Sequence, residues 1–369
     1  MILQRLSLIN FKNISETQLD FESGINAMVG DNGAGKTNIL DAIYYLSMCK
    51  SMLTMTDGQS VRHGADFFVV DGSYLSDTER HDSVVCTFTK QRTHTKVLKR
   101  NGKEYERLSD HVGMVPVVVV SPQDYALITD SAEERRRFIN AFLSQMSREY
   151  MQALIRYNAL LVQRNKSLKM VGDGSMLQIY DEQMAEYANT IYKYRCDIVE
   201  QLSPLVEKFY SALSGDRECV EIGYSSQMQE CGFVELMEQS RGRDFSNEFT
   251  TAGVHRDDIN FSIGGYPLRK YGSQGQQKSF LIALKLAQYI LVCRTVGERP
   301  ILLLDDLFDK LDAGRVEQLI GIVSGEDFGQ IFITDCNRTR IERVLSKGDT
   351  PFRLFEVEEG NVPQTKTTE

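Results

Sequence analysis

Two short segments near opposite ends of the chain carry residues suited to phosphoryl-transfer chemistry. The first, Gly30-Asp31-Asn32-Gly33-Ala34-Gly35-Lys36-Thr37, follows the pattern G-x-x-x-x-G-K-[ST]. In such a loop the glycines turn backbone N–H groups onto phosphate oxygens. The second segment, Ile301 to Asp306, is an apolar run that ends in Asp305 and Asp306. Together the segments predict a nucleotide site built from both ends of the chain.

Each residue of this predicted site has a role set by its chemistry. Lys36 reaches the β- and γ-phosphates and so contributes to catalysis, while the Thr37 hydroxyl ligates Mg²⁺. Asp305 acts on the same metal ion, and Asp306 orients the attacking water. The predicted cofactor is therefore ATP with Mg²⁺. The expected nucleotide contacts of this segment are Gly30, Asp31, Asn32, Gly33, Ala34, Gly35, Lys36, Thr37 and Asn38.

A third segment, Tyr271 to Ser279, precedes the strongly helical run Phe280 to Cys293. Ser273 is its best candidate for an N-cap. A helix that starts with small polar residues can bind an anion through its backbone N–H groups, as the phosphate-binding loop Gly30 to Thr37 (the P-loop) does. Taken alone, the segment indicates no more than an ordinary structural cap. The double carboxylate that follows it in the chain favours a nucleotide contact instead.

Alternating strands and helices must position these segments, which predicts an α/β fold. Ile25–Val29 and Val115–Val120 are apolar runs typical of buried strands, and Asn38–Met48 is typical of a helix. Residues 131–249 change to helical patterning, with an amphipathic hairpin over 148–170 and 176–213, turning at Gly172-Asp173-Gly174. We therefore expect an ATPase head from 1–130 and 250–369, interrupted by a short helical arm domain over 131–249.

Composition is that of a soluble globular chain. The 369 residues are 42% hydrophobic and 25% charged, and no apolar run approaches the length of a bilayer span. The 7 cysteines are scattered without a C-x-x-C pair, which indicates reduced thiols and a cytoplasmic location. The net charge of −9 excludes a uniformly basic nucleic-acid coat but not a local basic face.

One stretch is locally basic and contains the Asn101-Gly102 pair of a hairpin turn. Unpaired basic side chains on such a ribbon would neutralise DNA phosphates, whereas the alternative is a solvated sheet edge protected by charge. We favour DNA contact, in which the protein recognises the DNA backbone and the shape of a junction and not the base sequence. Lys12 could contact nucleotide or DNA, or be merely exposed. The expected DNA-binding residues are Lys90, Arg92, Lys96, Lys99, Arg100 and Lys103.

The order of these motifs resembles that of the ABC-type ATPases: P-loop, small polar helix cap, double carboxylate, Asp-rich loop and strand. That resemblance implies a dimer with ATP sandwiched between two copies, in which the cap segment closes over the γ-phosphate of the partner copy. The wide spacing resembles the chromosome-maintenance and repair branch, which carries a helical arm between the motifs. The resemblance assigns γ-phosphate contacts to Ser273, Gln274, Gly275 and Gln276.

Further motifs make the chain similar to the bacterial RecF family. They are Asn10-Phe11-Lys12-Asn13, Arg62-His63-Gly64-Ala65, Ser121-Pro122-Gln123-Asp124, Glu133 to Phe138, and His255-Arg256-Asp257-Asp258. The family usually has Pro-Glu-Asp where this chain has Pro122-Gln123-Asp124. The resemblance therefore gives Gln123 the role of the lid glutamine of other ABC ATPases, which contributes to catalysis and contacts the metal ion. The usual His and Arg after the P-loop helix are absent from Lys50 to Thr54.

The family resemblance implies an ATP-dependent dimer that clamps DNA at single-strand gaps and helps mediator proteins load recombinase. It also implies slow, switch-like hydrolysis, because Asp306 stands where transporter-type ABC ATPases have a glutamate. For His255 to Asp258 two interpretations stand: a site near the nucleotide or dimer interface, or a solvated charged turn. Alternatives for the whole chain are a short-armed structural ATPase that organises DNA, a regulatory ATPase, and a small-molecule kinase.

Overall fold

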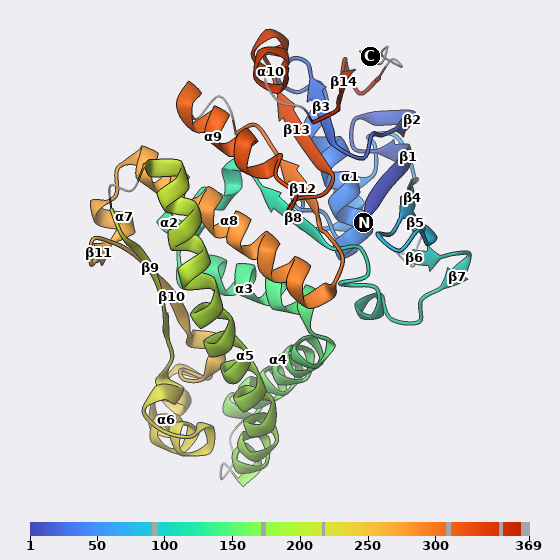
Figure 1. Cartoon of the computed structure of the whole chain (residues 1–369). Coiled ribbons are helices and arrows are strands. Elements are labelled where there is room, and N and C mark those ends of the chain that lie inside the picture. The colour runs from blue at the N-terminus through green and yellow to red at the C-terminus, as the bar shows by residue number, and fades with distance from the viewer. Residues whose placement is uncertain (91–94, 171–174, 216–217, 308–310, 347–349, 363–369) are drawn as a thin grey trace. The chain divides into compact units, whose positions relative to one another are not determined.

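The computed structural model describes residues 1–90, 95–170, 175–215, 218–307, 311–346 and 350–362 (Figure 1). Two compact units make up the chain. The head unit contains Met1–Gln123 and Gln288–Glu369, and the arm unit contains Asp124–Ala287. The expected turn at Gly172-Asp173-Gly174 and the predicted DNA contact Arg92 lie outside the described residues.

A parallel sheet forms one layer of the head unit. Its strand order is β14-β3-β13-β12-β8. Most of its strands are fully buried, which explains why they appear in the sequence as continuous apolar runs. The neighbours of Leu304 are Val120 on one side and Ile333 on the other, so these strands end at one edge. The strands are β3 Ile25–Val29, β8 Val117–Val120, β12 Ile301–Leu304, β13 Ile331–Asp335 and β14 Phe352–Glu356.

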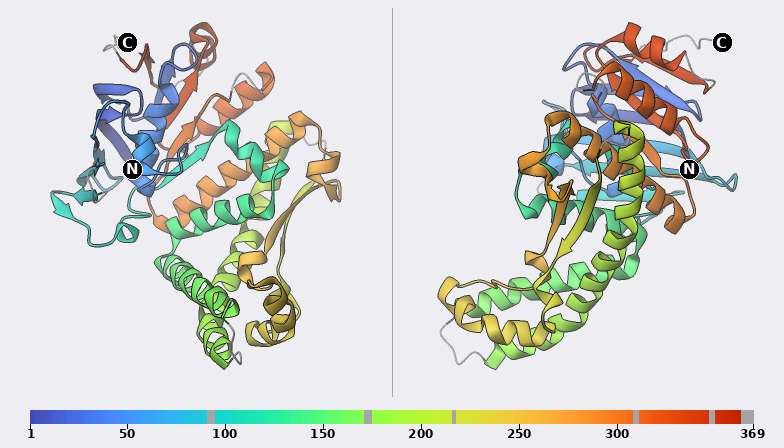
Figure 2. Two further views of the ribbon diagram at one scale, coloured as in Figure 1. Left: turned by 180° about the vertical axis from the view of Figure 1, so that it is seen from behind. Right: turned by 60° about the vertical axis from the view of Figure 1, so that its left-hand side comes forward.

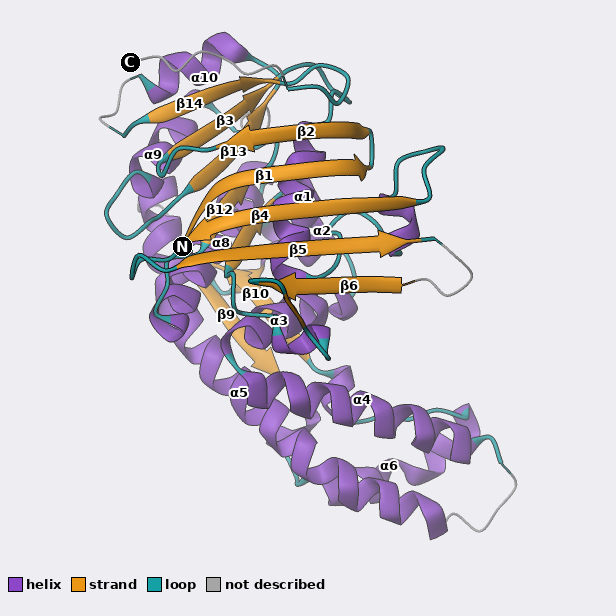
Figure 3. Ribbon diagram, turned by 90° about the vertical axis from the view of Figure 1, so that its right-hand side faces the viewer, coloured by secondary structure: helices purple, strands orange, loops and turns teal. Residues whose placement is uncertain are grey.

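An antiparallel sheet forms the second layer, with strand order β2-β1-β4-β5-β6-β7 (Figure 3). Helix α1 (Lys36–Met48) packs against strands of both sheets and so closes the core between them. Phe11, Tyr45 and Phe68 meet there edge to face, with ring centroids 5.3–6.0 Å apart. The strands are β1 Ile2–Phe11, β2 Ile14–Asp20, β4 Phe67–Leu75, β5 His81–Thr89, β6 Thr95–Arg100 and β7 Lys103–Glu104.

Short helices complete the head unit, and a long apolar helix joins the two units in the chain. Helix α8 (Gln274–Val296) is long and apolar enough to cross a membrane, but 72% of its apolar segment is buried inside the protein, as expected of a core helix. The other elements are the 3₁₀ helices η1 Asp57–Ser60, η2 Leu108–Asp110 and η3 Pro122–Tyr125, and the helices α9 Ala313–Val323 and α10 Arg338–Leu345.

The arm unit pairs two long helices, α4 and α5, which run side by side (Figure 2). Serine caps start the helices on either side of one turn: Ser131 accepts a hydrogen bond from Glu133 N, and Ser147 accepts one from Tyr150 N. A small antiparallel sheet, β11-β10-β9, completes the unit. Its elements are α2 Ala126–Thr129, α3 Ala132–Met146, α4 Arg148–Leu168, α5 Ser175–Ser214, β9 Val220–Ser225, η4 Gln227–Gln229, α6 Phe233–Asn247, η5 Val254–Arg256, β10 Asp258–Ile263, β11 Tyr266–Pro267 and α7 Leu268–Tyr271.

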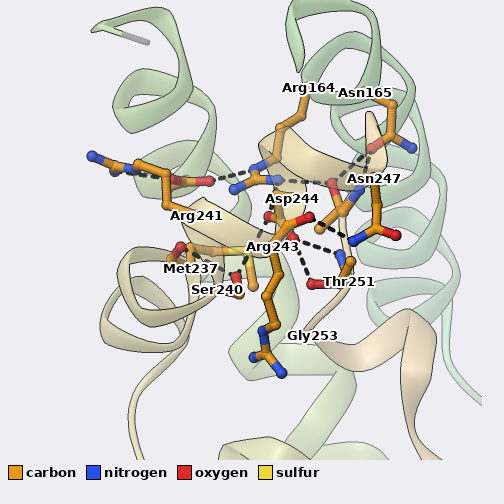
Figure 4. A network of polar contacts seen from close by, with 12 residues as sticks. Arg164, Asn165, Met237, Ser240, Arg241, Arg243, Asp244, Asn247, Thr251 and Gly253 are labelled. Carbon is orange, nitrogen blue, oxygen red and sulfur yellow. Dashed lines mark hydrogen bonds and ion pairs between the residues drawn. The ribbon is translucent and has the colours of Figure 1, made fainter. Parts of the chain in front are cut away.

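A buried polar network ties α4, α5 and α6 together (Figure 4). The Arg164 guanidinium is 0% exposed and lies 2.6 Å from an Asp181 oxygen and 2.7 Å from an Asp244 oxygen. It also donates to the Thr250 hydroxyl, and Asp244 accepts from the Thr251 N–H and hydroxyl. The network fixes three helices and the following loop in one arrangement.

The α/β fold class predicted from the sequence is confirmed, and the expected strands and arm helices are present to within a few residues. Two details differ. Strand β14 was not signalled by its short sequence, because only Leu354 and Phe355 of its 5 residues are buried. The cap at Ser131 is also one-sided, although Ser131 to Glu134 has the sequence of a capping box: Glu134 turns its carboxylate to Arg137, at 2.8 Å.

Candidate functional site

The P-loop requires glycine where its backbone is most contorted. Gly30 has φ +154°, and a Cβ there would lie 2.2 Å from the Val357 carbonyl oxygen. Gly35 has φ +116° and precedes the first residue of α1. These conformations suit glycine because it has no Cβ. They let α1 begin at Lys36, directly after the loop, so that the positive end of the helix dipole lies where a phosphate would bind.

Lys36 lies inside this loop. Its side chain is mostly buried, and its ammonium donates to the carbonyl oxygens of Gly30 at 2.7 Å and Asp31 at 2.8 Å. The charge is therefore fixed against the loop that would curl around a phosphate. A hollow beside it is lined by Asn32, Gly33, Gly35, Lys36, Thr37, Asn38, Asp306 and Thr334.

Thr37 and Asp305, far apart in the sequence, are in direct contact. The Thr37 hydroxyl donates to Asp305 Oδ1 at 2.8 Å. The contact arises because the P-loop follows β3 and Asp305 follows β12, and only β13 separates these strands in the sheet. A hydroxyl beside a carboxylate is a set of oxygen ligands that suits Mg²⁺, which binds few protein groups and keeps other positions for water and phosphate. The residues present therefore fit the predicted metal.

Asp306 is held in a left-handed backbone conformation, with φ +47°. Its N–H donates to the Thr334 hydroxyl oxygen at 2.9 Å, and that hydroxyl donates in turn to Asp305 Oδ1 at 2.8 Å. Non-glycine residues seldom adopt this conformation, which costs roughly 1 kcal/mol and concentrates at functional sites. Asp306 thus lines the hollow from a backbone fixed by Thr334.

Sequence reasoning missed Thr334 and Asn13 as parts of this site. Asn13 donates to the Ala34 carbonyl oxygen at 3.2 Å and accepts from the Asn38 amide at 2.7 Å, so it braces the loop from the N-terminal hairpin. Thr334 ends β13. Its residue type is ordinary for a strand end, so only its place beside two strands with site residues could have signalled it.

Lys12, predicted among the nucleotide contacts, is paired internally. Its ammonium lies 2.5 Å from an Asp41 carboxylate oxygen, and the Lys12 side chain is only 9% exposed. Asp41 also accepts from the Ser51 hydroxyl and the Met52 N–H. This geometry corrects the interpretation of Lys12 as merely exposed, because its positive charge is compensated by the carboxylate of Asp41, a residue of α1.

Ser273 caps α8, as its sequence predicts. Its hydroxyl oxygen accepts from Gln276 N at 3.3 Å, and the Gln276 side-chain oxygen accepts from Ser273 N at 2.6 Å, which is a reciprocal capping box. Gln276 also donates to Glu218 at 2.8 Å. The Ser273 and Gln274 side chains are exposed, and Gly275 is half-buried. In a single copy the Gln276 amide is thus engaged within the arm unit.

Gln123 lies in η3, three residues beyond the end of β8, and its side chain is exposed. The backbone at the end of β8 is joined to the carboxylate segment, because Asp305 N donates to Val120 O at 2.9 Å. The segment that carries Gln123 therefore begins at the strand edge where Asp305 lies.

The basic hairpin does not carry its charges on one face. Side chains alternate along β6, so Lys96, Leu98 and Arg100 face inward while Lys99 faces outward and is exposed. Lys96 donates to Asp57 at 2.8 Å and to the Cys49 carbonyl oxygen at 2.6 Å. The expectation of unpaired basic side chains is wrong for this residue.

Arg100 is paired as well, since its guanidinium donates to both oxygens of Asp82, at 3.1 and 2.8 Å. These bonds help to hold the pKa of Asp82 at about 2, below its usual range, although burial of the carboxyl acts in the opposite direction. Lys90, Lys99 and Lys103 remain exposed on the hairpin. Among the described residues of this hairpin, these three lysines are the ones placed to contact a phosphate.

The segment His255 to Asp258 is an internal junction of the arm unit. Asp257 is 3% exposed and lies 3.0 Å from the Arg195 guanidinium, which is itself 2% exposed. Asp258 pairs with Arg135 at 2.7 Å. The interpretation as a solvated charged turn is wrong, because its carboxylates are bound by arginines from α3 and α5.

The parallel sheet with its P-loop and strand-end carboxylates, together with a capped helix and an inserted arm, defines an ATPase head of the ABC type. Residues 2–362 match the model of the RecF/RecN/SMC N-terminal domain family. The chain belongs to this family and, within it, to the RecF proteins.

Two relatives called DNA replication and repair protein RecF illustrate the match. The protein of Phocaeicola vulgatus is 44% identical over 369 residues, covering 99% of both chains. That of Bacteroides thetaiotaomicron is 43% identical over 362 residues, covering 98% of both. A solved structure of the recombination mediator protein RecF-ATP in the RecFOR pathway is 29% identical, with a TM-score of 0.88 over 99% of this chain and 97% of that one. An SMC head bound to the C-winged helix domain of ScpA shares the fold, with 16% identity and a TM-score of 0.58 over 98% of this chain and 97% of that one.

Proposed function

We propose that this chain is an ATP-dependent DNA-binding protein of recombinational repair and replication restart. The observation that carries the proposal is the contact between the Thr37 hydroxyl and Asp305, which joins the P-loop to the strand-end carboxylates at 2.8 Å. Family membership supports the repair role, because the relatives are DNA replication and repair proteins and the similar structure holds ATP. We place the protein in the cytoplasm, with recombination mediator proteins as its partners.

In the proposed reaction the head unit binds and orients ATP. The P-loop N–H groups and Lys36 hold the phosphates, while Thr37 and Asp305 would hold Mg²⁺. Bound Mg²⁺ would neutralise charge on the transferred phosphoryl group. Asp306 would accept a proton from the attacking water and align it. Gln123, at the neighbouring strand end, would close over the same region.

Dimerisation is the proposed consequence of ATP binding. Ser273 and Gly275 lie at the capped start of α8, where backbone N–H groups attract anions. As in the ABC-type ATPases, this helix start would close on the γ-phosphate held by a second copy. ATP would then join two copies around DNA at a single-strand gap, and hydrolysis would release them. Slow, DNA-stimulated turnover would make the nucleotide a switch.

The experiment that tests this proposal is sedimentation velocity with and without Mg–ATP. We expect ATP to convert the wild-type monomer to a dimer, and Lys36→Arg to weaken this. Ser273→Arg and Ser273→Asp should stay monomeric yet bind ATP normally. Aspartate preserves the N-cap but repels a phosphate, which separates helix capping from phosphate contact. Ser246→Arg, an exposed change on α6, is the control that should still dimerise.

The dimer proposal fails if the wild-type chain remains monomeric with ATP and DNA at high concentration. It also fails if Ser273→Asp dimerises as the wild type does. In the latter case ATP binding and repair would not require this helix start.

A second prediction concerns the basic hairpin. Lys99→Glu should weaken duplex DNA binding and lower the salt dependence, by about one unit of slope in log K against log salt, because one phosphate contact is lost. Arg343→Glu on α10 is the matched charge reversal on another exposed position of the head unit and should change neither quantity. Fluorescence anisotropy at several salt concentrations measures both. An unchanged slope for Lys99→Glu would remove the hairpin from the DNA site.

A further inference from the structure

The arm unit contains a cavity of about 360 Å³ that the proposed nucleotide cycle does not use. Helices α3, α4 and α5 and the segment around η5 supply its walls. Its polar lining includes Arg136, Arg137, Asn140, Asn158, Arg195 and His255. The concentration of guanidinium and amide donors in one recess raises the question of what acceptor it serves.

The arginines around this cavity are matched with carboxylates, with one exception. Arg195 pairs with Asp257 at 3.0 Å, and Arg137 pairs with Glu134 at 2.8 Å and Glu133 at 3.3 Å. Arg136 donates one hydrogen bond, from Nη1 to the Asp257 carbonyl oxygen at 2.7 Å. Among the described residues its Nε and Nη2 have no acceptor, and no carboxylate pairs with it.

The position of Arg136 is electrostatically unfavourable in the molecule as it stands. Burial lowers the pKa of Arg136, and the positive charges of Arg195 and Arg256 lower it further, although the nearby carboxylates of Asp258 and Glu133 act in the opposite direction. The group remains cationic at neutral pH because an arginine pKa lies so far above it. An anion in the cavity would compensate this charge in a partly desolvated place, where such pairs are stronger than at the surface.

The amide side chains of the lining can supply further donors. Asn140 Oδ1 accepts from the Tyr150 hydroxyl at 2.6 Å and from Arg195 at 3.0 Å, so its remaining polar group is the NH₂ donor. Asn158 is exposed at the cavity and makes no side-chain hydrogen bond within the described residues. Both amides can therefore face an oxyanion.

His255 is neutral at physiological pH, since burial lowers its pKa to about 4. Its Nε2 must donate to the Thr250 carbonyl oxygen at 3.0 Å, which leaves Nδ1 to accept from the Tyr157 hydroxyl at 2.8 Å. Among the described residues that line the cavity, Glu133 carries the one carboxylate, and it is engaged by Arg137. The cavity thus keeps a cationic donor in Arg136 without depending on a protonated histidine.

We propose that this cavity is a second phosphate-binding site, in which Arg136 grips a phosphoryl group through Nε and Nη2, assisted by the amides of Asn140 and Asn158. A planar guanidinium presents two parallel N–H donors that match two oxygens of a phosphate. The site lies wholly within the arm unit and stands independently of the P-loop. Its ligand is either a free phosphate compound or a phosphate of the DNA backbone.

The direct test is calorimetric titration of the intact chain with inorganic phosphate, with Lys36→Ala in all proteins to disable the P-loop. Arg136→Gln and Asn158→Asp should each lower phosphate affinity at least about tenfold, the loss expected for one charge-assisted hydrogen bond. Asn158→Asp leaves the bond between Arg136 and Asp257 intact, and its position is exposed, so it tests the site without endangering the fold. Arg243→Gln, an exposed arginine of α6, is the matched control and should bind as before.

DNA titrations of the same variants, in chains with the native P-loop, distinguish the two sources of phosphate. If the ligand is a backbone phosphate, Arg136→Gln lowers duplex affinity and reduces the salt slope by about one, while Arg243→Gln does not. If DNA binding is unchanged while phosphate binding is lost, the ligand is a free phosphate compound. Equal phosphate affinity in Arg136→Gln, Asn158→Asp and the control would overturn the proposal, as would the absence of phosphate binding in the Lys36→Ala chain.

Discussion

Asp306→Asn is expected to lower ATP hydrolysis about 10²–10⁴-fold, the usual contribution of a general base, while ATP binding is retained. The carboxylate lines the hollow beside the P-loop. Asparagine preserves the shape of the side chain and tolerates the left-handed backbone at φ +47°, so the hydrogen bond from residue 306 N to Thr334 should persist. The substitution therefore removes the negative charge and little else.

Single-turnover hydrolysis and equilibrium nucleotide binding measure the two quantities separately. Asp312→Asn is a suitable control, because Asp312 is exposed and caps α9 through its side chain, and asparagine caps equally well. The Asp306→Asn variant should also remain dimeric after ATP is added, since the proposed release step depends on hydrolysis. Wild-type turnover in Asp306→Asn would exclude Asp306 as the base. Loss of ATP binding would instead indicate that Asp306 supports the metal ion.

The nucleotide site was largely predictable because its signals are local. The P-loop pattern specifies both the glycines and Lys36, and a buried strand ending in carboxylates specifies Asp305. That Thr37 meets Asp305 follows from parallel strands ending at one edge of the sheet. The hydrogen bonds made by Thr334 were not predictable, because a threonine at a strand end has no distinctive pattern.

The basic hairpin shows that a run of basic residues in the sequence does not by itself predict a surface of unpaired positive charge. Lys96 and Arg100 find their carboxylates in Asp57 and Asp82, which belong to other parts of the head unit. Nothing in the local sequence names these partners. A weaker signal was present, since strand alternation puts Lys96 and Arg100 on the same face as buried Leu98. A basic residue in register with a core residue is a poor candidate for a free phosphate contact.

Helix α4 of the arm unit also carries a charged residue whose partners the sequence does not identify. Tyr157, Arg164 and Leu168 are all buried on α4, at spacings that place them on one face. A charged residue within an apolar stripe indicates a buried partner, but helical periodicity cannot say which one. The partners, Asp181 and Asp244, come from α5 and α6, so only the tertiary arrangement identifies them.

Arg164→Ala should destabilise the arm unit by about 3–5 kcal/mol, the usual cost of removing one member of a buried ion pair. The substitution would leave the carboxylates of Asp181 and Asp244, which are 1% and 0% exposed, without their shared cation (Figure 4). Urea unfolding followed by circular dichroism measures the loss. Arg243→Ala, at an exposed position of α6, should change stability by less than about 0.5 kcal/mol.

A second substitution tests whether charge, and not packing, causes the loss. Asp244→Asn should destabilise the wild-type chain, because it weakens the contact with Arg164. In the Arg164→Ala background the same change should be stabilising, because it removes one uncompensated buried charge while its amide oxygen can still accept from Thr251. The sign of the effect therefore reverses between the two backgrounds. If Asp244→Asn destabilises both chains equally, the arginine acts mainly by filling space between the helices, and its charge contributes little to holding the arm together.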